Sequence, residues 1–168
     1  MHAFSDQVKT YYFEDDGEIP NNTLPLLVYP GVLNEYIDQM DEIFLQKGWH
    51  STWIGSVFTH HHYHSTAHEV LGVLSGEATI QFGGQCGRKL EVTPGDVLII
   101  PAGVGHKQLH GSKDFLVVGA YPDGQFKDMR TGDSKERPEV LHNIKEVPLP
   151  STDPVFGDDL VFLPFWSE

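Results

Sequence analysis

The chain has 168 residues, 39% of them hydrophobic and 11% aromatic, which predicts one globular domain over residues 1–168 with a core of useful size. The 24 acidic residues outnumber the 11 basic ones and leave a formal net charge of −13, so neither nucleic acid nor an anionic membrane is expected as a partner. The single cysteine, Cys86, excludes an internal disulfide and a cysteine-rich zinc site.

The first residues carry no pattern of a targeting segment. Met1–Gln7 lacks a basic region followed by an apolar one, and no apolar run in the chain is long enough to cross a bilayer. We therefore expect no signal peptide and no membrane partner, and a cytoplasmic location follows by default.

Residues 1–48 are predicted to form an arm and one helix. Prolines at positions 20, 25 and 30 favour an irregular arm, with one short strand at Thr10–Phe13. Residues 34–47 are predicted to be helical, with Asn34 as N-cap and Gly48 as C-cap. The apolar residues of this segment recur at helical spacing and predict a stripe that packs on the core: Tyr36, Ile37, Met40, Ile43 and Phe44.

Residues 49–121 are predicted to be strands joined by short turns, and they form the core of the fold. Glycine or proline marks most of the turns, and the strands between them are rich in β-branched and aromatic residues. Even spacing of short strands predicts a sandwich or a barrel. The expected strands are 51–64, 69–74, 77–82, 89–92, 97–100, 106–110 and 115–121.

Residues 122–168 are predicted to follow the barrel as a loop and a tail. Residues 122–139 are polar and rich in turn formers, which favours a solvated loop or a lid. Residues 140–168 favour an irregular segment. Its apolar end, Val161–Trp166, needs burial, so the tail is expected to pack on the barrel or across a dimer interface.

A cluster of histidines stands at residues 60–68, where five of the ten histidines of the chain lie, and Glu69 follows directly. Because side chains alternate along a strand, His62 and His64 are expected to share one face. Glu69 begins the next predicted strand and His106 begins a later one. Three imidazoles and a carboxylate that meet in a barrel lumen suit a divalent first-row metal, with open positions for water or substrate.

These residues resemble the two sequence motifs of the cupin superfamily. The first motif is His-x-His, four residues, Glu, six residues and Gly, which matches His62, His64, Glu69 and Gly76. The second is Gly, five residues, Pro-x-Gly, two residues and His, which matches Gly95, Pro101, Gly103 and His106. Two positions depart from the pattern: Gly55 lies one residue too far from the first motif, and His110 stands where the family has asparagine.

More closely, the chain resembles the small bacterial YjlB-type cupins. The resemblance is carried by residues 24–29, 61–72, 101–106, 115–121 and 147–150. It implies an all-β, double-stranded β-helix (jelly-roll) cupin barrel with one N-terminal helix, irregular N- and C-terminal arms, and assembly as a homodimer. It also implies one divalent transition metal, which would be iron, manganese, nickel or zinc, and these ligands: His62, His64, Glu69 and His106.

The remaining histidines and tyrosines of the region are expected to support the fold. Three histidines are interpreted as hydrogen-bonded or surface residues rather than ligands: His60, His61 and His68. For His110, the sequence does not decide between these two roles. Tyr63 and Tyr121 are expected in the core rather than in a pocket. The structural alternative to the metal site is a jelly roll whose polar lumen holds water.

The site favours a metal-dependent enzyme that acts on a small polar molecule. Iron would suit a dioxygenase, whereas manganese, nickel or zinc would suit an isomerase that uses a Lewis acid. Glu69 would be either a ligand or a general base, and no other catalytic residue is assigned. The alternative is a non-catalytic module that binds or senses a small molecule or a metal, because fold does not determine function.

Overall fold

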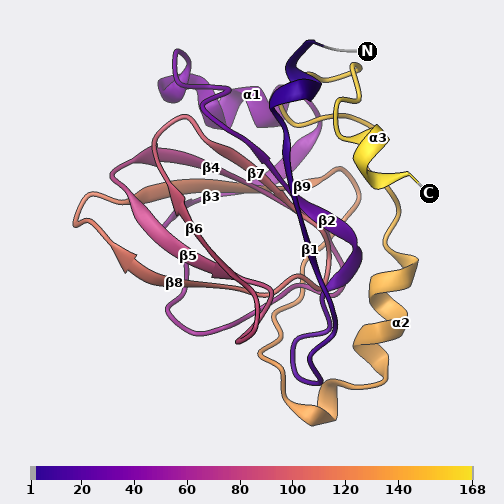
Figure 1. Cartoon of the computed structure of the whole chain (residues 1–168). Coiled ribbons are helices and arrows are strands. Elements are labelled where there is room, and N and C mark those ends of the chain that lie inside the picture. Colours follow the sequence, from indigo (N-terminus) through magenta and orange to yellow (C-terminus); the bar gives the residue numbers. More distant parts are fainter. Residues whose placement is uncertain (1–2, 168) are drawn as a thin grey trace.

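Two antiparallel sheets pack against each other in the computed structural model, which describes residues 3–167 (Figure 1). Residues 1–2 and 168, the ends of the predicted arm and tail, lie outside the described residues. The larger sheet contains, in spatial order, β1 (Lys9–Phe13), β2 (Asn22–Tyr29), β7 (Val97–Ile100), β4 (Glu69–Ser75), β9 (Leu116–Pro122) and β3 (Trp49–Gly55). The smaller sheet contains β6 (Arg88–Val92), β5 (Ala78–Phe82) and β8 (His106–Gly111). The predicted all-β jelly roll is confirmed.

The central strands of the larger sheet are buried on both faces. In β7, Leu98 and Ile100 contribute to the core between the two sheets, whereas Val97 and Ile99 contribute to a second core on the outer face. All four residues of this strand are buried, which explains why its sequence is a continuous apolar run rather than an alternating one.

Helices and the tail cover the outer face of the larger sheet (Figure 1). α1 (Met40–Gln46) contributes Met40 and Phe44, and α3 (Leu163–Trp166) contributes Trp166. α2 (Glu139–Glu146) instead packs Val140 into a small separate cluster with Tyr63. Three 3-10 turns complete the elements: η1 (Ala3–Gln7), η2 (Ile37–Gln39) and η3 (Ser134–Glu136).

A glycine is required at the turn that precedes β7. Gly95 has φ of +94°, and a Cβ atom at this position would lie 2.6 Å from the Cα atom of Asn34. The backbone nitrogen of Leu33 also donates to the carbonyl of Gly95, at 3.0 Å. This turn therefore holds the N-terminal arm next to β7, the strand whose side chains contribute to both cores.

The arm is more regular than its prolines predict. The segment that forms β2 was expected to be irregular, but it is a strand of the larger sheet. Its partners are β1 on one side and β7 on the other. Pro25 lies within β2, but the register between β1 and β2 shifts at this place and β7 pairs only with Leu27–Tyr29. A proline is tolerated there because no ladder hydrogen bond is required of its nitrogen.

The predicted helix at 34–47 is shorter than expected, and its cap was predicted wrongly. A turn occupies residues 30–35, η2 follows, and the α-helix begins only at Met40, with Gln39 rather than Asn34 at the N-cap position. Met40 and Phe44 are buried as predicted, whereas Tyr36 is exposed. The contact of Asn34 with Gly95 holds the chain in a turn and delays the helix.

The segment predicted as an irregular tail contains two helices, α2 and α3. For α2 a signal was present: Glu139 in the first turn, Lys145 in the last turn, and apolar residues at helical spacing at Val140 and Ile144. The apolar end of the chain packs on its own barrel. Phe162, just before α3, and Trp166, at the end of α3, are both buried in the outer core.

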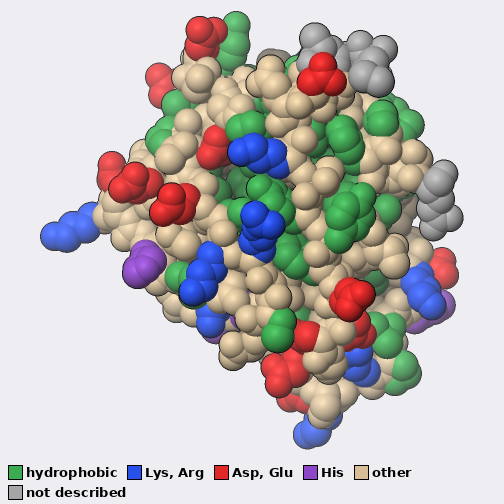
Figure 2. Space-filling model, viewed as in Figure 1, with side chains coloured by type: hydrophobic (Ala, Val, Ile, Leu, Met, Phe, Trp, Pro, Cys, Tyr) green, Lys and Arg blue, Asp and Glu red, His purple; other side chains and the backbone are tan. Residues whose placement is uncertain are grey.

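Charge is spread over the surface. Figure 2 shows acidic side chains at several separate places on one face, with basic side chains between them. Among residues 3–167, no helix combines the length and the apolar character that a membrane span needs.

Candidate metal centre

His62 and His64 lie on the loop between β3 and β4, and not on a strand. The predicted strand at 51–64 ends at Gly55. An isolated bridge then fixes the loop to β8, because the backbone nitrogens and carbonyls of His62 and His106 bond to each other at 3.2 and 3.0 Å. The alternation that the sequence predicts therefore holds locally, on a short extended stretch that pairs with His106.

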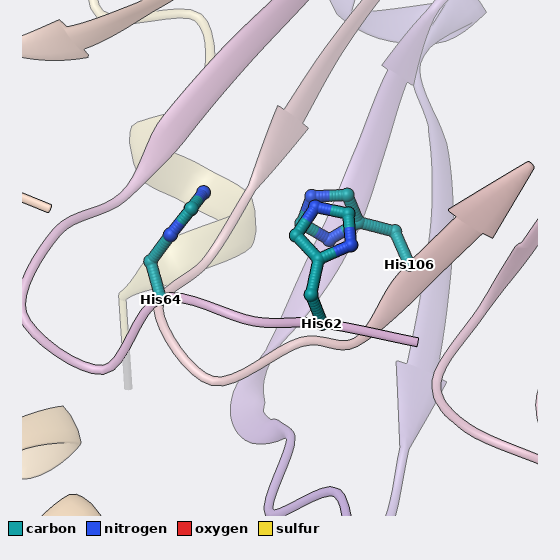
Figure 3. Close-up of side chains that lie close together, drawn as sticks. All are labelled: His62, His64 and His106. Atoms are coloured by element: carbon teal, nitrogen blue, oxygen red, sulfur yellow. The ribbon is translucent and has the colours of Figure 1, made fainter. Parts of the chain in front are cut away.

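The three motif histidines come together. One ring nitrogen from each of His62, His64 and His106 lies within 4.8 Å of the others, and all three side chains are buried. Figure 3 shows His64 reaching the centre from one side and the rings of His62 and His106 from the other. The ring centroids of His62 and His106 are 4.1 Å apart.

Glu69, the first residue of β4, lies beside two of these rings. Its Oε1 atom is 3.4 Å from the Nε2 atoms of both His64 and His106. Its Oε2 atom accepts a hydrogen bond of 2.7 Å from the hydroxyl of Tyr121. Oε1 is buried and has no hydrogen-bond partner among the described residues.

Backbone carbonyls orient all three imidazoles through the other ring nitrogen. Nδ1 of His62 lies 3.3 Å from the carbonyl of His60, Nδ1 of His64 lies 2.6 Å from that of Asp128, and Nδ1 of His106 lies 3.1 Å from that of Val104. A carbonyl only accepts, so Nδ1 must carry the proton and each neutral ring presents the lone pair of Nε2. The three histidines form a group whose ring nitrogens lie within 4.8 Å of one another, and Glu69 lies outside that group, beside His64 and His106.

The electrostatics of the centre suit a cation. Burial, and next the neighbouring His106, lower the pKa of His62 to about 2, so this ring is neutral at pH 7. Burial also opposes a charge on His64, but the Glu69 carboxylate outweighs it and raises the pKa of His64. Burial would raise the pKa of Glu69, yet His64 and His106 hold it well below its usual range. The centre therefore favours positive charge beside the anionic Glu69, whether from a protonated His64 or from a bound cation.

This donor set fits a divalent transition metal. Imidazole nitrogens and a carboxylate oxygen are ligands of zinc, iron, nickel and manganese. The orphaned Oε1 of Glu69 is the atom that such an ion would satisfy, and no described side chain donates to it. Burying the Glu69 carboxylate without a positive charge beside it would be costly.

The segment after β9 is largely exposed, as the sequence predicts, and a few of its residues also hold His64 in place. The Asp128 carboxylate accepts hydrogen bonds from the backbone nitrogen of Ser65, at 2.6 Å, and from its hydroxyl. Gln125 is buried, and its side chain accepts from the backbone nitrogen of His68 at 2.9 Å. Composition alone hides this role because the partners lie about sixty residues away in the chain.

A second set of contacts holds Glu69. The Nε1 atom of Trp53 donates to the hydroxyl of Tyr121 at 3.0 Å, and that hydroxyl donates to Glu69. Gly119 makes room for the indole, because a Cβ atom there would lie 2.3 Å from Trp53. Tyr121 is buried, as expected, and it also contacts the proposed metal ligand and lines the cavity beside it.

Replacing Tyr121 with phenylalanine is expected to weaken metal binding by about tenfold or more, because the groups that orient metal ligands typically contribute about 10- to 100-fold in affinity. The measurement is competition against a chromophoric chelator. Tyr63→Phe is the matched control, since it also removes a buried tyrosine hydroxyl from a glutamate, Glu136, at 2.6 Å. Equal weakening in both variants would contradict the role assigned to Tyr121.

A cavity of about 300 Å³ opens at this centre. Its volume lies at the lower end of the range for small-molecule sites. Its walls include the four predicted ligands together with these residues: Trp53, Gly55, Ser56, Val57, Phe58, Leu71, Tyr121, Lys127 and Met129. Most of these nine residues, including Trp53, Lys127 and Met129, were given no role in the site by the sequence analysis.

The other histidines of the cluster lie elsewhere. His60 is exposed and stacks on Phe58, with ring centroids 5.2 Å apart. His61 is half-buried, and burial lowers its pKa to about 4. His68 is buried, accepts from the backbone nitrogen of Ala102 at 2.9 Å and packs on Trp166. His110 is exposed on β8.

Comparison with known proteins places the chain among cupins. The profile described as "Cupin domain" matches residues 49–118. The chain is 47% identical over 161 residues to "Uncharacterized protein YjlB" of Bacillus subtilis (strain 168), which covers 95% of this chain and 97% of that protein.

Solved structures with a similar fold are more distant. The acireductone dioxygenase from Bacillus anthracis with a cadmium ion in its active centre matches with a TM-score of 0.39 and 15% identity, over 74% of this chain and 84% of the other. Pumpkin seed globulin matches with a TM-score of 0.39 and 22% identity, over 58% of this chain. The present chain spans only 28% of that globulin.

Proposed function

This chain belongs to the cupin family, in the group that includes YjlB of Bacillus subtilis, and on that basis we propose that it is a metal-dependent enzyme acting on a small molecule. The proposed ligands are His62, His64, Glu69 and His106. One observation carries the assignment: three buried imidazoles bring one ring nitrogen each within 4.8 Å of the others, and an unpaired oxygen of Glu69 lies 3.4 Å from two of them.

The cavity supports a catalytic role over a purely structural one. A metal that only stabilises the fold is usually enclosed by protein ligands, whereas a catalytic metal keeps a position open. Here the proposed ligands line a space of about 300 Å³. A divalent ion held there would supply a Lewis acid, and iron would also supply redox chemistry.

The protein's own groups would prepare the site for a reaction. Glu69 stays ionised, and its bond from Tyr121 holds one oxygen while leaving the other directed at the centre. Trp53 in turn fixes the Tyr121 hydroxyl. The apolar wall of the cavity would exclude water from around a bound molecule and strengthen the electrostatic interactions there.

The proposal predicts one metal ion per chain. Protein purified without a metal-affinity tag and analysed by elemental mass spectrometry should contain close to one equivalent. Iron would favour a dioxygenase-type reaction, and zinc, nickel or manganese an isomerase-type reaction. Protein that cannot be loaded with any of these ions would contradict the proposal.

Removal of the ion should also lower thermal stability. A ligand present at 100 times its Kd stabilises the folded state by about 2.7 kcal/mol, and each kcal/mol shifts the Tm of a protein of this size by about 2–4 °C. A chelator should therefore lower the Tm by roughly 5–10 °C, and added metal should restore it. The His64→Ala variant is the control, because its Tm should not respond to the chelator.

Assembly and location complete the proposal. We expect one cupin domain, a cytoplasmic protein and a homodimer, and light scattering of the purified protein tests the last of these. A non-catalytic binding or sensing role is the alternative. It would be favoured if metal-loaded protein bound a small molecule without converting it.

A further inference from the structure

The cavity beside the metal centre has an apolar wall. Its side walls are built largely from Trp53, Val57 and Leu71, and Phe58 and Met129 lie where the cavity meets solvent. These last two side chains are 50% and 42% exposed. Apolar groups left open to water at the mouth of a cavity gain free energy when an apolar ligand covers them.

One basic side chain, Lys127, lines the same cavity. Its Nζ atom lies 5.5 Å from the centroid of the Tyr121 ring, and the side chain is exposed at the mouth. No described acidic side chain forms an ion pair with it. Among residues 3–167, Glu69 is the only acidic residue in the cavity wall. Lys127 is therefore a cation available to a ligand.

The charge of the loaded site would be positive although the chain is acidic. Three neutral imidazoles and one carboxylate would leave a divalent ion with one net positive charge, and Lys127 adds a second. The chain as a whole has a formal net charge of −13. Local charge within a low-dielectric cavity outweighs distant surface charge, which salt screens over about 8 Å under physiological conditions.

From this combination we infer that the site takes a small carboxylate with an apolar body. This inference rests on the proposed metal centre. The carboxylate faces Lys127 and the ion, and the body packs on Trp53 and Phe58. A phosphate monoester is the competing anion, but among the described residues the cavity wall offers no guanidinium for a bidentate contact, so the titration below compares the two anions directly.

Calorimetric titration of the zinc-loaded protein tests the inference without any assay of activity. The probes are benzoate, phenylacetate and hexanoate, each compared with its uncharged amide. At least one carboxylate is expected to bind about tenfold more tightly than its amide. Lys127→Met should reduce that advantage several-fold, because only the ion then attracts the carboxylate, and Lys127→Arg should retain most of it.

Lys113→Met is the matched control. It changes the net charge by the same single unit, but Lys113 is an exposed residue outside the cavity wall. Equal affinity of carboxylate and amide, no binding of any probe, tighter binding of phenyl phosphate than of benzoate, or equal effects of Lys127→Met and Lys113→Met would each overturn the inference. Zinc content is measured first. Protein that takes up no zinc or other ion would refute the proposed function and this inference with it, whereas loaded protein that fails the titrations refutes this inference alone.

Discussion

The His64→Ala variant is expected to lose most of its bound metal, whereas His61→Ala should keep it. Nε2 of His64 lies 3.4 Å from Glu69, and its Nδ1 is held by the carbonyl of Asp128 at 2.6 Å. Because loss of a group that only orients a ligand already costs about 10- to 100-fold in affinity, loss of the ligand itself should cost more than about 100-fold. Elemental analysis and chelator competition measure the difference.

His61 is a demanding control because it lies in the same histidine run. It is half-buried, and the ring is not among the three whose nitrogens converge. Circular dichroism of both metal-free variants establishes that each is folded. Equal losses of metal in two folded variants would show that the assignment of His62 and His64 as the ligand pair is wrong.

Replacing Trp166 with alanine should destabilise the protein by about 3–5 kcal/mol, the usual cost of removing a buried tryptophan. The side chain is 2% exposed and its Nε1 atom donates to the carbonyl of Pro25 at 2.9 Å. It also packs edge-to-face on Phe162, with ring centroids 5.5 Å apart. The Tm should fall by about 10 °C, since each kcal/mol corresponds to about 2–4 °C at this chain length.

Urea unfolding of Phe126→Ala provides the comparison for this variant. Phe126 is an aromatic residue of the same chain that is 79% exposed, and its removal should change the free energy of unfolding by no more than about 0.5 kcal/mol. A loss in Trp166→Ala no larger than in this control would mean that the tail does not contribute to the outer core. The result bears on the site as well, because Trp166 packs on His68, next to Glu69.

Much of the strand pattern was readable from local signals. Val97–Ile100 is predicted and observed with the same bounds, because an apolar run between Pro-Gly and proline leaves few alternatives. β2 was not predicted, since Pro25 argues against a strand and only the neighbouring strands show where its missing N–H is harmless. α2 carried a readable signal in its end charges and spacing, but the turn-rich residues before it obscured that signal.

The sequence by itself determined the kind of fold, and its resemblance to the cupin motifs proposed four metal ligands, of which the structure brings the three histidines together. It could do so because two short motifs hold these residues at spacings that suit a jelly roll. Only the tertiary structure decided what surrounds these residues. The Tyr121 hydroxyl donates to Glu69, the Asp128 carbonyl contacts the His64 ring, and Lys127 lines the mouth of the cavity. The physical reason is that hydrogen bonds and cavity walls join residues more than fifty positions apart, and periodicity carries no information about such contacts.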